Sequence, residues 1–451
     1  MKGRIAMGEL RVGAAQVDIT PPLGSVLAGS LSPRYADDVS YPLMSKAVVF
    51  DDGERSVAYV QNDLIVLVRE QFAVAKARAQ ELTGIASECM MMSCTHTHYG
   101  PATYSMFEVP AEEEYVAWAL QRIGDAVKLA HNRLQPAVIG HTSGSCPEET
   151  HNRRWWMTDG SVQMNPPVAS KELVRPAGPT DPEVALLVAE TPEGTPIAAI
   201  ANYSLHYVGG AGNVISADYF GAFAEALQRM AGSEFVAIMA NGCCGDTNNV
   251  DRSKPPVEPA RPSPNYRVDR VGNALAAECW KTWSQLDERT RDLTVDAALA
   301  TPTYRRRTAA EEERRRVAGG QSAVEQIADK WPQYAETYAE ERAAIDEWPL
   351  EMETEVQALR IGDMAMVGFP GEFFVEFGIN TKRLSPFART MTIELANDWI
   401  GYVPTDRGLD EGGYETWLAR SARVAKGAEG RFMEAASMLL GDLAATAPAA
   451  R

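Results

Sequence analysis

The sequence predicts an α/β protein made of mixed β-sheets with helices on their faces. Short apolar runs, typical of buried strands, alternate along the chain with longer amphipathic runs, typical of helices. The chain has 451 residues, of which 45% are apolar and 23% charged, so it can bury a large core and has an ordinary globular composition. We expect one layered domain over residues 8–445, with short flexible termini at 1–7 and 446–451.

The first half of the chain begins with strands and helices in alternation. The predicted strands are residues 10–19, 46–51, 56–62 and 88–94, and the predicted helices are 69–83 and 111–134. An irregular stretch with several prolines follows from residue 146 to residue 180. Loops of this length usually carry function or are insertions, so we expect it to contribute to a site.

The alternation resumes after residue 180. Predicted strands cover 183–190, 196–206, 235–241, 355–369 and 391–398, and predicted helices cover 217–231, 266–286 and 423–442. Residues 308–350 differ, because they are rich in Ala, Glu and Gln and contain charge pairs at helical spacing. This composition predicts a solvent-exposed helical insertion.

The charge balance argues against two classes of partner. Lysine and arginine total 43 and aspartate and glutamate total 61, which gives a net charge of −18. A surface this acidic repels nucleic-acid backbones and anionic membranes. No apolar run reaches the length of a transmembrane helix, so stable membrane insertion is not expected. The start of the chain lacks an apolar signal core, which favours the cytoplasm.

The six cysteines form no CxxC pair and are too sparse for a disulfide scaffold, so reduced thiols are expected. Cys243 and Cys244 are adjacent. A thiolate is a good zinc ligand, but adjacent cysteines rarely both reach one ion. Buried packing as small apolar side chains is therefore the ordinary alternative for this pair.

The clearest motif is Thr-His-Thr-His-Tyr-Gly-Pro at residues 95–101, directly after an apolar strand. Residues i and i+2 of an extended chain project to the same side, so His96 and His98 are expected to face one site. That site would lie at the carboxyl end of the strand, where α/β sheets place their ligands. One imidazole can hold a metal ion while the other contacts the substrate or transfers a proton. Two hydrogen-bonding structural histidines are the alternative.

Two further side chains follow apolar strands. His206 ends the predicted strand 196–206, and Glu372 follows a strand and a Pro-Gly turn. Taken singly, the histidine could be structural, and the carboxylate could stand at a helix start because the helix dipole favours it there. Taken with the histidine motif, two imidazoles and one carboxylate are a usual ligand set for catalytic zinc, which leaves a position open for water. Zinc lowers the pKa of that water and polarises a carbonyl.

The order of these motifs resembles the catalytic domain of the neutral/alkaline (non-lysosomal) ceramidase family. The matching segments are spread over almost the whole chain and include a twelve-residue interval between Tyr402 and Tyr414. They are residues 17–22 (VDITPP), Asp63, 95–101 (THTHYGP), Asn152-Arg153, 180–182 (TDP), His206, 215–218 (ISAD), 241–246, 370–372 (PGE) and 402–405 (YVPT). Each segment is a weak indication alone, and their common order makes the resemblance specific.

The resemblance implies one zinc ion and three side chains around a scissile amide. The implied zinc ligands are His96, His206, Glu372 and Tyr402. The side chains implied to face the substrate and to act in catalysis are His98, Arg153 and Tyr414, with the adjacent Arg154 as an alternative to Arg153. Members of the family hydrolyse the amide of N-acylsphingosine with the zinc-bound water.

The chain departs from the family pattern in one loop. Where the family has GDxSPN with an active-site serine, this chain has Gly-Asp-Thr-Asn-Asn at 245–249, so Asn248 takes the position of the serine. Asparagine can donate and accept hydrogen bonds but cannot be a nucleophile. Zinc-and-water chemistry is compatible with the change, whereas contacts with a ceramide headgroup would differ. We expect Asn248 to contact a different substrate.

Four more residues are expected around the site. Asp218 and Asp246 are candidates to orient a ligating histidine from behind, or to hold a second metal ion. Trp155 and Trp156 lie in the long 146–180 stretch, which could act as a lid. They are expected to give the substrate site an apolar wall.

The sequence therefore predicts a zinc-dependent hydrolase that cleaves an amide (N-acyl) bond with metal-activated water. No segment matches the C-terminal β-sandwich domain of the family, and we expect a small soluble substrate rather than ceramide. Homo-oligomerisation is left open. One alternative is an esterase, lactonase or sugar-linkage hydrolase on the same zinc site. The other is a non-catalytic metal-binding protein on the hydrolase scaffold.

Overall fold

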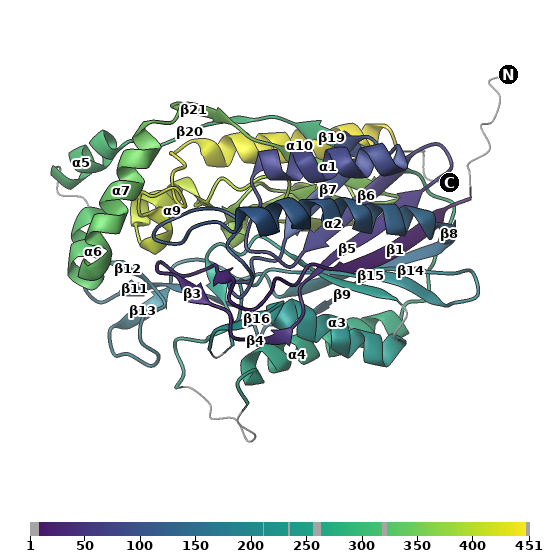
Figure 1. The fold of residues 1–451 in the computed structure, drawn as a ribbon, viewed down its shortest axis with the longest axis horizontal. Coiled ribbons are helices and arrows are strands. Elements are labelled where there is room, and N and C mark those ends of the chain that lie inside the picture. Colours follow the sequence, from purple (N-terminus) through teal and green to yellow (C-terminus); the bar gives the residue numbers. More distant parts are fainter. Residues whose placement is uncertain (1–8, 211, 233–234, 256–262, 318–322, 448–451) are drawn as a thin grey trace.

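The computed structural model describes residues 9–447 except 211, 233–234, 256–262 and 318–322. The predicted flexible termini, 1–7 and 446–451, therefore lie outside the described residues, apart from 446 and 447. Three β-sheets surround one apolar core, and pairs of helices cover their outer faces (Figure 1). This architecture confirms the predicted α/β class with mixed sheets and flanking helices.

The first sheet contains the strand that leads to the histidine motif. Its strands, in spatial order, are β7 (Met90–Cys94), β6 (Ser56–Asn62), β5 (Met44–Asp51), β1 (Arg11–Asp18) and β8 (Gln135–Pro136). β6 and β7 are parallel, and the other pairs are antiparallel. Helices α1 (Arg69–Thr83) and α2 (Glu113–Asn132) pack on the outer face (Figure 1), where Phe72 and Ile123 are buried.

The second sheet leads to His206. Its order is β17 (Val236–Asn241), β15 (Pro196–Tyr203), β14 (Glu183–Glu190) and β9 (Val138–Ser145). β15 and β17 are parallel neighbours. Helices α3 (Asp218–Ala231) and α4 (Tyr266–Ser284) cover its outer face and bury Phe223 and Leu275.

The third sheet leads to Glu372. Its order is β19 (Val295–Ala300), β22 (Val356–Ile361), β23 (Met364–Gly368) and β25 (Arg389–Ile393). β23 and β25 are parallel. Helices α8 (Val375–Leu384) and α10 (Ala428–Ala445) pack against it, with Phe377 and Phe432 in the interface.

The inner faces of all three sheets meet in one cluster of buried side chains, which includes Val12, Leu187, Ile238 and Met366. Because helices cover the outer faces, the central strands are buried on both sides and have apolar runs rather than strict alternation. Strands β7, β15 and β23 come from different sheets, and each has a parallel neighbour. The residues that follow these three strands form the site described below.

The stretch 146–180, predicted to be irregular, contains short strands. They are β10 (His151–Asn152), β11 (Arg154–Met157), β12 (Val162–Met164) and β13 (Leu173–Pro176). β11 pairs with β12 and β13, and β10 pairs with β18 (Thr247–Asn248). Two- to four-residue strands interrupted by prolines carry too little periodicity to be found from sequence. Their pairing ties this stretch to the loop that holds Asn248.

The insertion at 308–350 is helical as predicted, with α5 (Ala309–Val317), α6 (Ala323–Lys330) and α7 (Ala335–Asp346). It is not wholly solvent-exposed, however. Ile327 and Tyr338 are buried in a cluster with Trp417, and Trp331 packs on the same cluster. The buried carboxylate of Glu341 accepts hydrogen bonds from Arg420. One face of the insertion therefore covers the body of the protein, because aromatic residues spaced along it find apolar partners there.

Shorter elements complete the described chain. They are β2 (Val26–Leu27), β3 (Arg34–Tyr35), β4 (Asp38–Tyr41), β16 (Val214–Ser216), β20 (Thr303–Arg305), β21 (Glu351–Glu353), β24 (Glu372–Phe373), β26 (Tyr402–Val403) and α9 (Asp406–Glu411), with 3-10 turns at Ser87–Cys89, Pro332–Tyr334 and Tyr414–Thr416. Within the described ranges, no helix combines the length and the apolar composition that crossing a membrane requires.

Candidate metal centre

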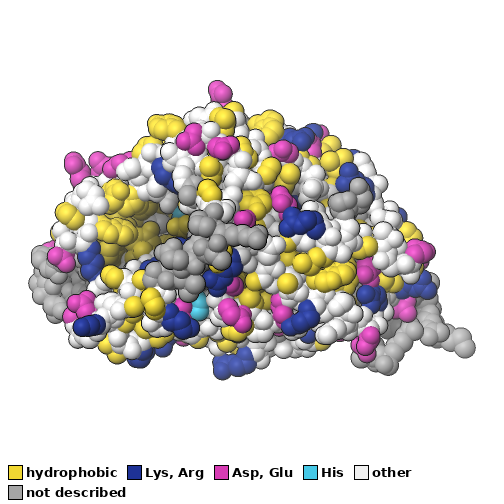
Figure 2. Space-filling view, turned by 90° about the horizontal axis from the view of Figure 1, so that it is seen from below, with side chains coloured by type: hydrophobic (Ala, Val, Ile, Leu, Met, Phe, Trp, Pro, Cys, Tyr) yellow, Lys and Arg dark blue, Asp and Glu magenta, His cyan; other side chains and the backbone are white. Residues whose placement is uncertain are grey.

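A cavity of about 380 Å³ opens beside the ends of β7 and β15. Figure 2 shows it as a hollow lined mainly by hydrophobic side chains, with a histidine at its inner edge. His96, His98, His206, Glu372 and Tyr402 all line it. The cavity thus holds the four implied zinc ligands together with the second histidine of the motif.

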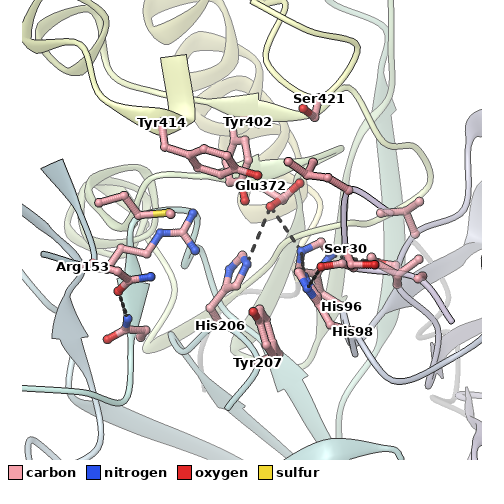
Figure 3. A pocket seen from close by; sticks show the side chains of 18 of the residues that line it. Ser30, His96, His98, Arg153, His206, Tyr207, Glu372, Tyr402, Tyr414 and Ser421 are labelled. Carbon is pink, nitrogen blue, oxygen red and sulfur yellow. Dashed lines mark hydrogen bonds and ion pairs between the residues drawn. The ribbon is translucent and has the colours of Figure 1, made fainter. Parts of the chain in front are cut away.

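The three imidazoles converge at the floor of this cavity (Figure 3). The ring centroid of His96 lies 4.7 Å from that of His98 and 4.6 Å from that of His206. One ring nitrogen from each of the three lies within 4.8 Å of the others. His206 comes from the second sheet and the other two from the first, so this cluster depends on the packing of the sheets.

The backbone at His96 differs from the predicted extended conformation. Its φ is +62°, in the left-handed region, and its N–H donates to the carbonyl of Leu64. The ring Nδ1 lies 3.0 Å from the carbonyl oxygen of Ile65, which can only accept, so Nδ1 carries the proton and Nε2 carries a lone pair. His96 and His98 therefore face one site because the chain turns sharply after β7, not because they alternate along a strand.

His98 is held in the same tautomer. Its Nδ1 donates to the carbonyl of Gly29 at 2.9 Å, and its ring stacks on Tyr207 with centroids 3.6 Å apart. The Nε2 atoms of His96 and His98 lie 3.1 Å apart. Because both carry lone pairs, a cation or a shared proton between them would remove their repulsion.

Glu372 completes the cluster from the third sheet. Its Oε2 lies 3.3 Å from Nε2 of His96 and 3.9 Å from Nε2 of His206, and its Oε1 accepts a hydrogen bond from Trp399 at 3.1 Å. Glu372 stands in β24, which pairs with β26 and so brings Tyr402 alongside. It does not begin a helix, since α8 starts at Val375. The helix dipole therefore does not explain this carboxylate.

Electrostatics keep these groups in the protonation states that bind metals. Burial and the neighbouring cationic and imidazole groups lower the pKa of His98 and of His206 well below the usual range. Burial opposes ionisation of Glu372, but the adjacent His96 and the hydrogen bonds from Trp399 and Tyr402 outweigh it and lower the pKa of this carboxyl. Neutral imidazoles at His98 and His206 beside the ionised carboxylate of Glu372 suit a divalent ion.

A second observation also indicates that the imidazoles and Glu372 can bind a metal ion. Nε2 of His206 and Oε2 of Glu372 are buried and have no hydrogen-bond partner. Buried polar atoms are almost always satisfied, and an ion bound between them is one accepted reason for an exception. Acceptor atoms from three imidazoles and a carboxylate point at one small volume. These residues fit a zinc-like cation by number, type and protonation state.

The family is shown by comparison with known proteins. The model of the neutral/alkaline non-lysosomal ceramidase N-terminal domain matches residues 10–254. The chain belongs to this family. Neutral ceramidase A of Dictyostelium discoideum is 23% identical over 304 residues, which are 60% of this chain and 40% of that protein. The chain thus spans less than half the length of this curated relative.

Two solved structures share the fold. Neutral ceramidase from Pseudomonas aeruginosa has a TM-score of 0.74 and 20% identity, covering 98% of this chain and 75% of that one. A ceramidase complexed with C2 has a TM-score of 0.75 and 16% identity, covering 98% and 76%. At these identities the likeness shows the ceramidase fold alone.

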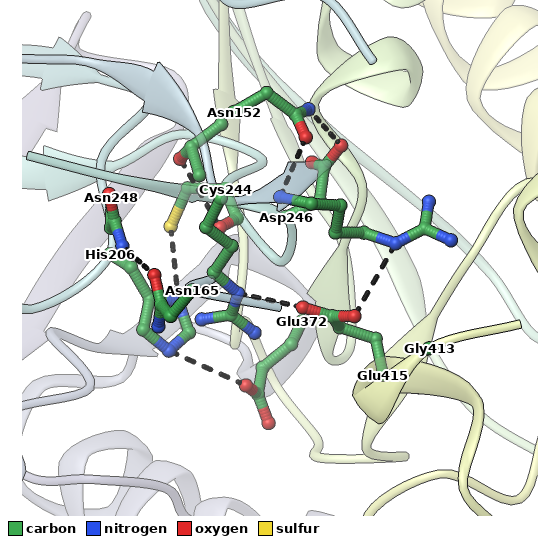
Figure 4. A network of polar contacts seen from close by, with 12 residues as sticks. Asn152, Asn165, His206, Cys244, Asp246, Asn248, Glu372, Gly413 and Glu415 are labelled. Atoms are coloured by element: carbon green, nitrogen blue, oxygen red, sulfur yellow. Dashed lines mark hydrogen bonds and ion pairs between the residues drawn. The ribbon is translucent and has the colours of Figure 1, made fainter. Parts of the chain in front are cut away.

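In this ceramidase-family chain, Arg153 faces the cavity and Arg154 does not. The buried guanidinium of Arg153 lines the cavity, and its Nε donates to Glu415 at 2.8 Å (Figure 4). Arg154 turns to the other side, where its guanidinium lies over the ring of Phe374 and donates to the carbonyl of Gly412. Arg153 directly precedes β11 and Arg154 is its first residue, so these adjacent side chains point to opposite sides, and Arg153 is the one that lines the cavity.

Sequence reasoning missed Glu415 and Glu394 as site residues. Glu415 is fully buried, and its Oε2 also lies 3.4 Å from Nε of Arg154, so it is the shared counter-ion of two arginines. Glu394 accepts hydrogen bonds from both the thiol and the backbone N–H of Cys244. A signal for Glu415 existed in its position next to Tyr414, but nothing in the sequence links Glu394 to Cys244.

The two cysteines have different surroundings. Cys243 packs in the apolar core beside the third sheet, as expected for a buried thiol. Sγ of Cys244 lies 3.9 Å from Nδ1 of His206 and donates to Glu394. Burial, followed by the charge of Glu394, raises the pKa of Cys244 well above the usual thiol range. Among the described residues, His206, Cys244 and Glu394 form the second group with metal-binding geometry, in place of the pair of aspartates that the sequence suggested.

Asp218 and Asp246 were predicted to orient a ligating histidine, but their hydrogen-bond partners are other groups. Asp218 accepts hydrogen bonds from the backbone N–H groups of Val208 and Gly209, directly after the His206 segment, rather than from an imidazole. Asp246 accepts from the backbone of Val375 and from the side chain of Asn152, and burial raises its pKa to about 6. Both carboxylates brace loops, since backbone carbonyls already hold the rings of His96 and His98.

The apolar wall is also built differently from the prediction. Trp155 and Trp156 lie in β11 and do not line the cavity, because they pack within the small β12–β11–β13 sheet. The tryptophans that line it are Trp399 and Trp331, the latter from the helical insertion. Tyr414 and Asn248 line the cavity as expected.

Gly29 offers a test of what His98 does. Its φ is +82°, and a Cβ there would lie 2.2 Å from the ring of His98. We expect Gly29→Ala to displace His98. If His98 is a general acid–base group, kcat should fall by about 10²-fold or more. Metal content per protein chain should be unchanged if His98 acts on the substrate and should fall if it is a ligand.

Gly24→Ala is the matched control for this substitution. Gly24 has the same kind of backbone, with φ at +89°, but no atom lies within 4 Å of the place that a Cβ would take. It therefore carries the backbone cost of a side chain in the left-handed region, roughly 1–2 kcal/mol, without the collision. Equal losses of activity in the two variants would show that strain, not the position of His98, is responsible.

Proposed function

We propose that this chain is a zinc-dependent hydrolase of amide bonds in small soluble N-acyl compounds. The observation that carries the proposal is the convergence of His96, His206 and Glu372 at the floor of a largely apolar cavity, with unpaired acceptor atoms on His206 and Glu372. Membership of the ceramidase family and the names of the relatives support amide hydrolysis. Asn248, in the place of the family's serine, supports a substrate other than ceramide.

The zinc ion would be held by His96, His206, Glu372 and Tyr402. When bound, such an ion lowers the pKa of a water molecule and polarises a carbonyl group. Burial and the charge of Glu372 raise the pKa of Tyr402 well above the usual phenol range, so this residue needs a nearby cation before its oxygen can ligate as an anion.

The remaining side chains divide the work on the substrate. Nε2 of His98 carries a lone pair toward the cavity and can accept a proton and release it to the leaving amine, while Gly29 holds the ring from behind. Tyr414 keeps its hydroxyl proton, since burial raises its pKa, and can donate a hydrogen bond to the oxygen on which charge develops.

Arg153 would orient the substrate. Its Nη2 is buried without a partner on the cavity side, while its Nε is fixed by Glu415. A guanidinium with one edge fixed and one edge free can hold the substrate's carbonyl or a polar group beside it. Its position under the ring of Tyr402, 5.5 Å from the centroid, places that free edge next to the implied ligands.

The test combines metal analysis with a substrate panel. We expect the purified protein to contain about one zinc ion per chain, to lose activity on chelation and to regain it with zinc. N-acyl amino acids, N-acyl amino sugars and short-chain ceramides, each paired with the matching ester, should show turnover of a small polar amide. Absence of any transition metal, or turnover of esters and not of amides, would contradict the proposal.

A further inference from the structure

The cavity has two chemically different walls. One is apolar and contains Leu31, Ile65, Phe107 and Trp331. The other is polar and contains Asn165, Asn248, Arg252 and Arg267. The imidazole cluster lies within the same cavity, so a molecule that reaches the candidate metal centre meets both walls.

The polar wall is held in place by its own contacts. Asn165 adopts a left-handed backbone with φ at +49°, and its Oδ1 accepts hydrogen bonds from Nδ2 of Asn248 and, at 2.9 Å, from Nη2 of Arg252. The backbone N–H of Asn165 donates to the carbonyl of Arg153 at 2.8 Å. The wall is thus attached to the arginine that faces the cavity, and Figure 4 shows the contact between Asn165 and Asn248.

Arg252 and Arg267 in this wall have no carboxylate partner among the described residues. In the described part of the chain, Arg252 donates only to the side chain of Asn165 and the carbonyl of Pro166, and no ion pair joins Arg252 or Arg267 to a carboxylate. Nε of Arg252 is buried without a partner. Burial and the positive charge of Arg267 lower the pKa of Arg252. By contrast, Arg153 in the same cavity has the carboxylate of Glu415.

The helix that carries Arg267 also disfavours a positive charge at this position. Arg267 stands in the first turn of α4, where the positive end of the helix dipole disfavours a cation. The chain as a whole carries a net charge of −18, so carboxylates are abundant elsewhere. Among the described residues neither guanidinium has a carboxylate partner, and a bound anion would stabilise this arrangement through charge-assisted hydrogen bonds and reduced repulsion.

We propose that this wall binds an anionic group, so that the substrates are amphipathic amides with an apolar chain at one end and a carboxylate, sulfonate or phosphate at the other. The inference rests on the proposed function, since it names the substrate class of the same site. The apolar chain would lie along Leu31, Phe107 and Trp331. The anion would lie at Arg252 and Arg267, and the amide between them would reach His98 and Arg153.

The first experiment compares substrates of equal shape and different charge. N-decanoylglycine and N-decanoylethanolamine differ only in the anionic end, and the monodecylamide of succinic acid carries its anion on the acyl half instead. We expect kcat/KM for one of the two anionic amides to exceed that for the neutral amide by about 10- to 100-fold, the range of a charge-assisted hydrogen bond. Equal values for all three would overturn the inference.

Variants of the two arginines test whether this wall causes the preference for anionic substrates. In Arg267→Gln and in the double variant with Arg252→Gln, the ratio of anionic to neutral kcat/KM should fall toward one. Arg267 is exposed, so its single replacement does not disturb packing. Arg229→Gln is the control and should keep the ratio of the wild type, because Arg229 lies on the surface of α3 and pairs with Glu225 of the same helix. A ratio that survives in the double variant would contradict the assignment.

Binding measured without turnover separates this inference from the proposed function. Ketone analogues, 4-oxotridecanoate and 1-hydroxytridecan-4-one, keep the shape of the two decanoyl amides and cannot be hydrolysed. Calorimetry should show at least about 10-fold tighter binding of the anionic ketone to the wild type and not to the double variant. If no amide is hydrolysed but this difference is seen, the proposed function fails and the anion site stands. If both ketones bind equally, the anion site fails whatever the enzyme cleaves.

Discussion

Glu372→Gln should remove the tightly bound metal ion and lower amide hydrolysis by more than about 100-fold, since loss of a residue that merely orients a ligand already costs about 10- to 100-fold. Trp399 donates to Oε1 of Glu372, so the amide oxygen of the glutamine will take that place. Its NH₂ group will then face Nε2 of His96 and of His206, where an acceptor stood before. A donor in this position satisfies the imidazoles and excludes a cation.

Metal content by elemental analysis and the thermal midpoint measured with and without zinc check this result. The variant should fold, because glutamine fits the same space and satisfies the lone pairs, but zinc should no longer raise its midpoint. Glu376→Gln is the control. Glu376 lies four residues further along the chain, in α8, and pairs with the exposed Arg407. One zinc ion per chain in the Glu372 variant would show that this carboxylate is not a ligand.

Glu415→Gln should destabilise the protein by about 3–5 kcal/mol, the usual cost of removing one partner from a buried ion pair. Glu415 is fully buried between the guanidiniums of Arg153 and Arg154. Arg153 is left with no other ion pair among the described residues, whereas Arg154 keeps Glu411 at 3.3 Å. The cost therefore arises mainly from an uncompensated charge at the wall of the cavity.

Urea denaturation followed by circular dichroism measures this change. Glu411→Gln is the matched control, because Glu411 is closer to solvent and also pairs with the exposed Arg407, so its loss should cost less than the loss of Glu415. The Glu415 variant should also raise KM, since the guanidinium of Arg153 loses its fixed edge. Stability equal to that of the wild type would show that the two arginines are neutralised in another way.

Much of the fold follows from local patterns. The helices 69–83 and 217–231 and the strands 56–62 and 183–190 were predicted within a residue or two of their observed bounds, because each carries a long apolar or amphipathic run. Strands of two to four residues, such as β10 and β24, were not predictable, because their backbone hydrogen bonds come from partners far away in the chain.

The candidate site also contains residues that the sequence indicated and residues that it could not indicate. The motifs at strand ends pointed to His96, His98, His206 and Glu372, and the family resemblance added Tyr402. The structure brings all five to one cavity. Sequence could not show that Trp155 packs away from the cavity while Trp331 enters it from an insertion, since each depends on which surface the chain happens to meet.

Residue types along the chain were therefore enough to predict the fold class, because periodicity is a local property. The implied set of metal ligands came from the order of motifs that the chain shares with a known family. The tertiary structure was needed for the partners. It places Glu415 between two arginines and Glu394 on Cys244, and within the described ranges it leaves Arg252 and Arg267 beside the cavity without a carboxylate. Charges and unpaired lone pairs interact through space, so their balance at a site exists only once three sheets have brought distant segments together.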